Sequence, residues 1–158
     1  MRIIVVSDTH GNYNALKKIF EKNLSADMFI HLGDGEREFM ELSGLYPQKA
    51  MRNVAGNCDF APLSPEVAVI GAGEHKIIAS HGHRYGVKYG IDHIKMIALK
   101  NGADIVLFGH SHVRFNYYED GIYFFNPGSA SSPRDGKRPS YGFIDITAHG
   151  VVANHVEL

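Results

Sequence analysis

Apolar runs alternate with amphipathic segments along the first third of the chain. Residues 2–7 and 27–32 are rich in apolar residues and have the length of buried strands. Residues 12–23 repeat their apolar positions at helical spacing, and a shorter helix is expected over residues 36–44, which end in a glycine. A weaker strand is expected over residues 49–56. This βαβα order is typical of α/β folds.

The second half of the chain carries more strand patterns than helix patterns. Residues 65–70 and 75–80 predict two strands joined by a hairpin-like turn. An amphipathic helix is expected over residues 90–102, and a further buried strand over residues 103–108. Four later segments alternate apolar and polar positions and are expected to form antiparallel strands: residues 113–120, 121–126, 141–146 and 151–158. We therefore predict a single α/β domain over residues 1–158, with a mixed arrangement of strands in two packed sheets.

Composition narrows the classes of function. The chain has 158 residues, of which 44% are hydrophobic and 21% charged, and its formal net charge is −1. These values are ordinary for a globular protein and indicate neither a nucleic-acid patch nor a surface for anionic membranes. The apolar runs are too short to span a bilayer, and a strand pattern follows Met1 where a secretion signal would stand. Cys58 is the only cysteine, which excludes an internal disulfide and favours the cytoplasm.

Polar residues with metal-binding or catalytic chemistry follow five of the expected strands, usually beside a glycine. They are Asp8 and His10, then Asp34, then Asn57, Cys58 and Asp59, then His81 and His83, and finally His110 and His112. Ligands of open α/β sheets bind outside the carboxyl ends of the strands. The loops that carry these residues are therefore expected to converge on one pocket.

Oxygen and nitrogen donors without a thiolate cluster suit divalent metals such as Mn, Fe, Co, Ni or Zn. The donors are too many for one tetrahedral site and about right for two metals that share a carboxylate. His110 and His112 are two residues apart, roughly 6.5 Å along an extended chain, so each can serve one of two metals about 3.5–4 Å apart. Two dications, two aspartates and a bridging hydroxide leave a net positive charge, which favours an anionic phosphate ester as substrate.

The series Asp8-x-His10, Gly33-Asp34, Gly56-Asn57-x-Asp59, His81-Gly82 and Gly109-His110-x-His112 resembles the calcineurin-like metallophosphoesterase superfamily. The GNCD form of the third motif and the NPGS at 126–129 are most similar to the YfcE-type phosphodiesterases. The resemblance implies an α/β fold with a two-sheet mixed β-sandwich flanked by helices. It also implies a dinuclear metal centre, with Mn as the usual activating metal and Ni, Fe, Co or Zn as alternatives.

Carried over position by position, the resemblance assigns Asp8, His10 and His112 to one metal. It assigns Asn57, His81 and His110 to the other, with Asp34 between them. Many members carry a histidine where this chain has Cys58, and a thiol is a poor substitute for an imidazole. We therefore expect modest activity, best on phosphodiesters with good leaving groups, with Cys58 or His83 as weaker catalytic candidates.

Other interpretations remain open at this stage. Asp8 could cap the following helix, Asn57 could be a turn residue, and the two histidines of residues 110–112 could lie on the surface. Asp59 is expected to orient the loop around it, His31 to be packed, and residues 128–137 to form a connecting loop. The alternatives to a phosphodiesterase are a phosphomonoesterase and a non-catalytic scaffold resembling the retromer subunit of the same superfamily. Homodimers and homotetramers are both compatible with the sequence.

Overall fold

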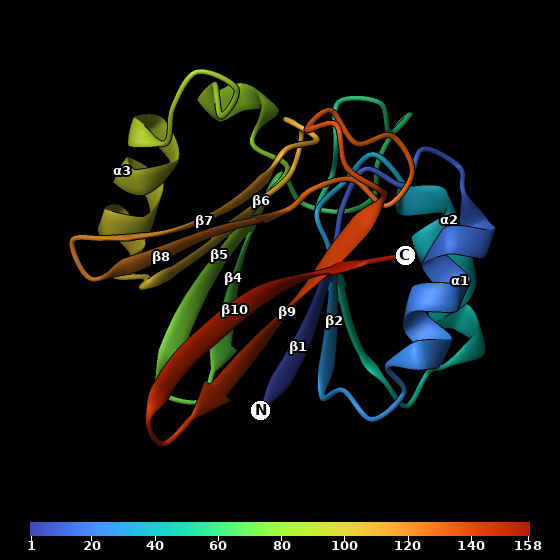
Figure 1. The fold of residues 1–158 in the computed structure, drawn as a ribbon, viewed down its shortest axis with the longest axis horizontal. Helices are drawn as coiled ribbons and strands as arrows, with labels where there is room; N and C mark the ends of the chain where they lie inside the picture. Colours follow the sequence, from blue (N-terminus) through green and yellow to red (C-terminus); the bar gives the residue numbers. More distant parts are fainter.

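Two five-stranded sheets pack face to face in the computed structural model, which describes all residues 1–158 (Figure 1). The first sheet contains, in spatial order, β10 (Gly150–Glu157), β9 (Ser140–Thr147), β1 (Arg2–Val6), β2 (Met28–His31) and β3 (Ala50–Asn53). The second contains β4 (Val67–Ala72), β5 (His75–Ser80), β6 (Ile105–Phe108), β8 (Ile122–Pro127) and β7 (Arg114–Glu119). The helices are α1 (Tyr13–Lys22), α2 (Glu36–Leu45) and α3 (Asp92–Asn101), with a short 3-10 helix, η1 (His83–Tyr85).

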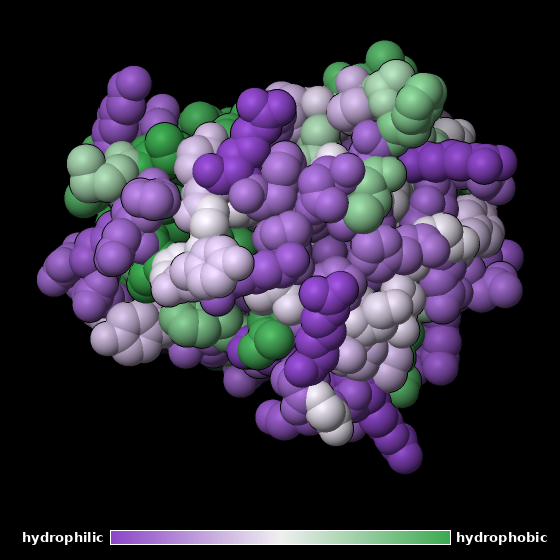
Figure 2. Space-filling view, turned by 90° about the horizontal axis from the view of Figure 1, so that it is seen from above, coloured by the Kyte–Doolittle hydropathy of each residue, from purple (hydrophilic) through white to green (hydrophobic).

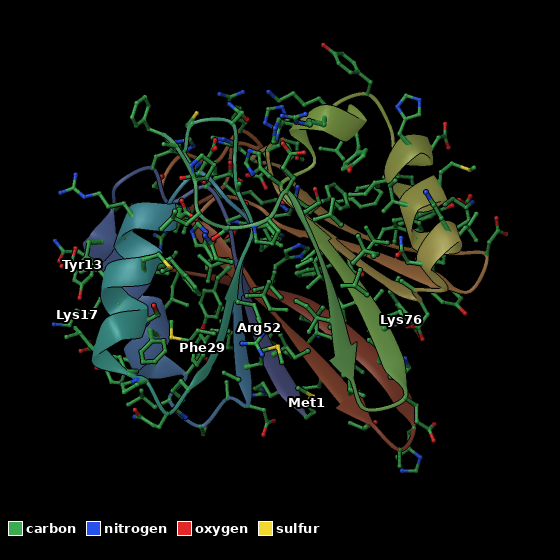
Figure 3. All side chains as sticks on the ribbon, turned by 180° about the vertical axis from the view of Figure 1, so that it is seen from behind. Met1, Tyr13, Lys17, Phe29, Arg52 and Lys76 are labelled. Atoms are coloured by element: carbon green, nitrogen blue, oxygen red, sulfur yellow. The ribbon has the colours of Figure 1, made fainter.

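Strand β1 shows why its sequence is apolar at nearly every position. Ile3 and Val5 belong to the central core between the two sheets, whereas Ile4 and Val6 belong to the core beneath α1 and α2. Successive side chains of a strand point to opposite faces, so a strand that is covered on both faces needs apolar residues throughout. Phe29 of β2 lies between the sheet and this helix pair, while Lys17 of α1 points outward (Figure 3).

The second sheet is covered in the same way by α3. Ile105 and Leu107 of β6 face the central core, and Val106 and Phe108 pack with Ile94 of α3. The molecule is therefore a helix–sheet–sheet–helix sandwich, in which α1 and α2 lie on one side and α3 on the other (Figure 1). The predicted two-sheet mixed α/β sandwich flanked by helices is confirmed.

Three details of the sequence-based prediction are wrong. The helix expected to close at Gly44 continues through this glycine to Leu45. The strand expected over residues 49–56 ends at Asn53, because Ala55 donates its backbone N–H to Pro65 and not to the neighbouring strand β2. The segment over residues 121–126 is not purely antiparallel: β8 pairs antiparallel with β7 but parallel with β6. Alternation of apolar and polar residues reports which faces are buried, and it carries no information about the direction of the neighbouring strand.

The parallel strands bring their carboxyl ends to one end of the sandwich. Strands β1, β2 and β3 run parallel in the first sheet, and β5 and β6 run parallel in the second. The loops that follow them meet at the top of Figure 1. None of the helices is long and apolar enough to cross a membrane.

Candidate metal centre

Both sheets supply side chains to the end of the sandwich where the loops meet. Asp8 and His10 follow β1, Asp34 follows β2 and Asn57 follows β3, all in the first sheet. The second sheet supplies the three other predicted ligands, which are His81 after β5 and His110 and His112 after β6. The predicted ligands thus converge from loops that lie far apart in the sequence.

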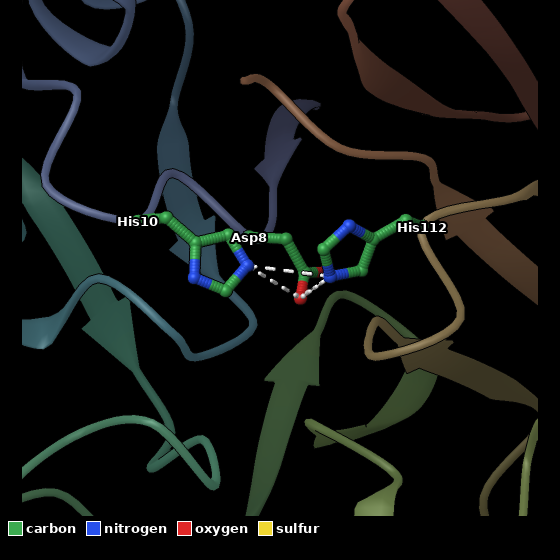
Figure 4. A group of neighbouring side chains, drawn as sticks. All are labelled: Asp8, His10 and His112. Atoms are coloured by element: carbon green, nitrogen blue, oxygen red, sulfur yellow. Dashed lines mark hydrogen bonds and ion pairs between the residues drawn. The ribbon is translucent and has the colours of Figure 1, made fainter. Parts of the chain in front are cut away.

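One group of donors consists of Asp8, His10 and His112 (Figure 4). His112 Nε2 lies 3.1 Å from Asp8 Oδ1 and 3.3 Å from His10 Nε2. Asp8 Oδ2 accepts hydrogen bonds from the Ser7 hydroxyl and from the backbone N–H of His110. Asp8 Oδ1 is buried and accepts no hydrogen bond, so it is left facing the imidazoles. A buried carboxylate oxygen in this state is stabilised by a cation.

A second group consists of Asp8, Asp34 and His81. His81 Nε2 lies 3.4 Å from Asp34 Oδ2, 4.0 Å from Asp8 Oδ1 and 3.1 Å from Asn57 Oδ1. Asp34 Oδ1 accepts the backbone N–H of Cys58 at 2.7 Å, which turns Oδ2 toward the imidazole. The same Oδ2 lies 3.9 Å from His10 Nε2. Asp34 therefore lies between the two groups, as expected of a shared ligand.

Backbone carbonyls fix the tautomers of two of these imidazoles. His81 Nδ1 donates to the carbonyl of Leu32 and His112 Nδ1 to that of Ser132, each at 2.7 Å. A neutral ring with its proton on Nδ1 presents a bare lone pair at Nε2. In both rings this lone pair faces carboxylate oxygens, an arrangement that is repulsive unless a positive charge lies between them. The donors present therefore fit divalent cations, whose histidine ligands usually donate the other ring N–H in this way.

The pKa values of the same groups reflect this need for positive charge. Burial disfavours ionisation of Asp8, but His112 and His81 outweigh it and hold the pKa of Asp8 below its ordinary value. Burial is likewise outweighed at Asp34, whose pKa is lowered by His81 and by the Cys58 N–H. Burial lowers the pKa of His81, yet Asp34 and Asp8 raise it above its ordinary value, and the Asp8 carboxylate does the same for His112. Without metal, protons occupy the place of the cations.

His110 and His83 lie at the edge of the centre. The His110 ring is 5.1 Å from that of His81 and 6.1 Å from that of His83, between ring centroids. Burial and the positive charge of His81 lower the pKa of His110 to about 4. The pKa of His83 is lowered for the same two reasons. Both imidazoles are therefore neutral at physiological pH, as a metal ligand or a proton acceptor must be.

Cys58 is exposed and lies within the group formed with His10 and Asp34. Although the residue is exposed, partial burial of its thiol and the neighbouring Asp34 raise the pKa of Cys58 to about 11. The side chain is therefore a neutral thiol at physiological pH and cannot supply the positive charge that a protonated histidine would supply there.

The backbone is strained at five of the candidate ligands. Among non-glycine residues, a positive φ is found at Asp8, His10, Asp34, His110 and His112, and elsewhere only at Ala61 and Asp120. The left-handed region costs on the order of 1 kcal/mol per residue, although Asp and His tolerate it better than most residues. Strain of this kind concentrates at functional sites, because the surrounding structure must hold it in place.

Neighbouring groups hold the loops in position, and expectations for two of them, Asp59 and His31, come from the sequence. The Asp59 carboxylate accepts the backbone N–H groups of Asp34, Gly35, Glu36 and Gly56, at 2.8–2.9 Å. This confirms that Asp59 orients its loop. His31, expected to be packed, is fully buried between Thr9 and Asn53.

The role of residues 128–137 was underestimated from the sequence. Ser129 is fully buried, and its hydroxyl donates to the backbone carbonyl of Asp8 at 2.8 Å, beside Ser131 at 3.0 Å. Asn126 donates to the carbonyl of Gly109, just before the histidine pair. The only sequence signal for these contacts is the NPGS stretch at residues 126–129. The family resemblance includes this stretch but does not say what it contacts.

Comparison with known sequences identifies the family. A sequence model of the calcineurin-like phosphoesterase superfamily domain matches residues 1–149. The chain belongs to this superfamily. Probable metallophosphoesterase YsnB of Bacillus subtilis is 33% identical over 147 residues, which cover 92% of this chain and 85% of YsnB. Phosphodiesterase YfcE of Escherichia coli is 27% identical, with 97% of this chain and 92% of YfcE covered.

Solved structures of similar proteins have the same fold. The crystal structure of a conserved uncharacterized protein from Streptococcus pneumoniae, described as a predicted phosphoesterase, superposes with a TM-score of 0.88 at 31% identity, covering 99% of this chain and 88% of that one. Wild-type Vps29 of Entamoeba histolytica, crystallised with Zn²⁺, superposes with a TM-score of 0.73 at 20% identity and covers 99% of this chain and 98% of that one. At this identity the second comparison supports the fold alone.

Proposed function

We propose that this phosphoesterase-superfamily protein is a metal-dependent phosphodiesterase with a dinuclear centre. The observation that carries the proposal is the pair of imidazoles, His81 and His112, whose Nε2 atoms face the carboxylates of Asp34 and Asp8 while their Nδ1 atoms are hydrogen-bonded to backbone carbonyls. The proposed ligands of one metal are Asp8, His10 and His112, those of the other are Asn57, His81 and His110, and Asp34 is shared. Mn is our first candidate, with Ni, Fe, Co or Zn as alternatives.

Two divalent cations held by these donors would supply the chemistry of a nucleophile at neutral pH and of charge neutralisation at a phosphoryl group. The chain's own part is to hold the donors in place. Leu32 and Ser132 fix the imidazoles through their carbonyls, Cys58 fixes Asp34 through its N–H, and Ser7 fixes Asp8. This preorganisation places the donors before the substrate arrives.

The residue at position 58 favours activated diesters. The neutral Cys58 thiol beside Asp34 offers neither a charged donor nor a strong acid for a leaving alkoxide. Good leaving groups need no such proton. We therefore expect phosphodiesters with acidic leaving groups to react fastest, and a Cys58→His variant to gain most on poor leaving groups. His83 is the neighbouring imidazole that could take up part of this role.

The test uses protein stripped of metal by a chelator, with Mn²⁺ titrated in during hydrolysis of bis(p-nitrophenyl) phosphate. We expect activity to rise with metal and to fall about a hundredfold in Asp34→Asn, since the amide keeps the size of the side chain but removes a shared charged ligand. Asp145→Asn is the matched control: Asp145 is paired with Arg2 on the surface and should leave the activity unchanged.

The same assay separates the alternatives. Faster turnover of p-nitrophenyl phosphate than of the diester would indicate a phosphomonoesterase. No turnover with Mn, Ni, Co, Fe or Zn, although metal binds, would contradict the enzyme and favour a scaffold that resembles Vps29 in fold. Activity that is equal in wild type and Asp34→Asn would contradict the proposed shared ligand.

A further inference from the structure

A cavity of about 780 Å³ opens beside the proposed metal ligands, between helix α2 and the loop over residues 58–63. His10 and Asp34 form its inner wall, so the cavity is continuous with the metal centre. Its size is in the range of pockets that bind whole small-molecule ligands, which is much more than a phosphate group occupies. Figure 2 looks onto this end of the molecule, where separate hydrophobic patches, one of them at the upper right, interrupt a mostly polar face.

Buried carboxylates of α2 hold the walls of this cavity in place. Glu36 accepts the backbone N–H groups of Leu63 and Ser64, at 3.1 and 2.7 Å, and so fixes the outer end of the 58–63 loop. Glu38 accepts the N–H of Gly11 at 2.7 Å and so fixes the loop that carries His10. Because both glutamates belong to the first turn of one helix, the two walls keep a defined separation. The fold itself therefore fixes the shape of the cavity.

The outer wall is apolar although no core requires it. Phe60 is 98% exposed, Leu63 is 89% exposed and Met40 is 48% exposed, and all three line the cavity. None of them belongs to a hydrophobic core cluster. A phenyl ring, a thioether and a branched aliphatic chain together form a surface suited to a flat apolar group, since rings stack on rings and thioether sulfur contacts ring edges favourably.

The carboxylates around the cavity disfavour a second anionic group on the ligand. Three carboxylates line the cavity, those of Asp59, Glu36 and Glu38, and each accepts backbone N–H groups. They add negative potential to the cavity and donate no hydrogen bond to a ligand. Arg37 is the only lysine or arginine among the lining residues. It pairs with no carboxylate, and its planar guanidinium can stack on an aromatic ring. A neutral, planar ester group fits this environment better than a polyphosphate or a carboxylate.

We propose that this cavity binds a neutral aromatic ester group of the substrate, with Phe60 against the face of the ring. The inference rests on the proposed phosphodiesterase function and specifies its substrate class as diesters that carry an aromatic group. The phosphate lies at His10 and Asp34, and the aromatic group extends from there toward α2. Phe60 is thus a specificity residue that contacts substrate without taking part in bond cleavage.

Binding and turnover test the inference separately. Binding of phenyl phosphate and of methyl phosphate to the Mn-loaded protein is measured by calorimetry in wild type, Phe60→Ala and Tyr89→Ala. Tyr89 is the matched control, because it is 95% exposed on a loop that does not line this cavity. We expect wild type and Tyr89→Ala to bind phenyl phosphate about tenfold more tightly than methyl phosphate, which is the difference in affinity typical of one stacked ring. Phe60→Ala should bind both about equally.

Turnover of bis(p-nitrophenyl) phosphate supplies the second readout, and kcat/KM should fall about tenfold in Phe60→Ala. Equal binding of the two phosphates by wild type, or a phenyl preference that survives in Phe60→Ala, would overturn the inference. A phenyl preference that disappears in Phe60→Ala supports the cavity even in a protein that hydrolyses no diester. That last result would contradict the proposed function and leave the binding inference intact, so the two failures are distinguishable.

Discussion

Gly109→Ala is expected to disturb the metal centre from behind the ligands. Gly109 is buried at the end of β6, and a Cβ added there would overlap the Ser7 hydroxyl and lie 2.9 Å from Asp8 Oδ2. Ser7 donates to that same oxygen, so the methyl group displaces the contact that orients Asp8. Overpacking of this kind costs about 2 kcal/mol of the free energy of unfolding. Misplacing an oriented ligand lowers metal affinity by roughly 10–100-fold.

The assay is urea denaturation of the chelator-stripped protein, followed by Mn²⁺ titration calorimetry. Gly44→Ala is the matched control, because Gly44 lies exposed within α2 and an added Cβ would contact nothing within 4 Å. Alanine is a better helix former, so this variant should be more stable by about 0.5–1 kcal/mol and bind metal normally. A Gly109→Ala protein as stable as wild type, with unchanged Mn²⁺ affinity, would refute the argument that close approach at this glycine positions Asp8.

Two further outcomes are expected. Asp59→Asn removes a charged acceptor of four backbone N–H groups and should lower the free energy of unfolding, measured in urea, by about 2 kcal/mol. The control Asp145→Asn breaks an exposed pair with Arg2 and should lower it by less than about 1 kcal/mol. Equal losses in the two variants would contradict this account. The neighbouring carboxylates raise the pKa of His81 and His112. At a pH below these raised pKa values both imidazoles hold protons, which compete with metal, so the Mn²⁺ affinity measured by calorimetry should rise from pH 6 to pH 8. Affinity that is flat over this range would show that these imidazoles are not ligands.

The sequence was most informative where local pattern and chemistry coincide. An apolar run that ends in Asp8, Asp34, His81 or His110 predicts both a buried strand and a donor at its carboxyl end, and the structure places all four at one end of the sandwich. The family resemblance then arranged these donors into two groups. Neither inference required knowledge of how the sheets pack.

Contacts between side chains and distant backbone groups could not be predicted. Ser129 holds the carbonyl of Asp8 from 121 positions away, and the partner of His112 Nδ1 is the carbonyl of Ser132. Every residue carries a carbonyl, so no pattern marks the one that accepts. Phe60 likewise stands in a turn-rich stretch, and only the three-dimensional position of that loop against α2 gives the ring a role.

The division of the ligands between the two sheets has a consequence for assembly of the protein. His10 and His112, which are 102 positions apart, come from different sheets and meet only when those sheets are docked. Contacts of such long range form late, after the entropy of closing a large loop has been overcome. A chain with one finished sheet holds only four or three of the seven proposed ligands, so we expect it to bind metal weakly. During refolding we therefore expect metal uptake to report the docking of the sheets, because any ion bound at the proposed site would link the two sheets at the open end of the sandwich.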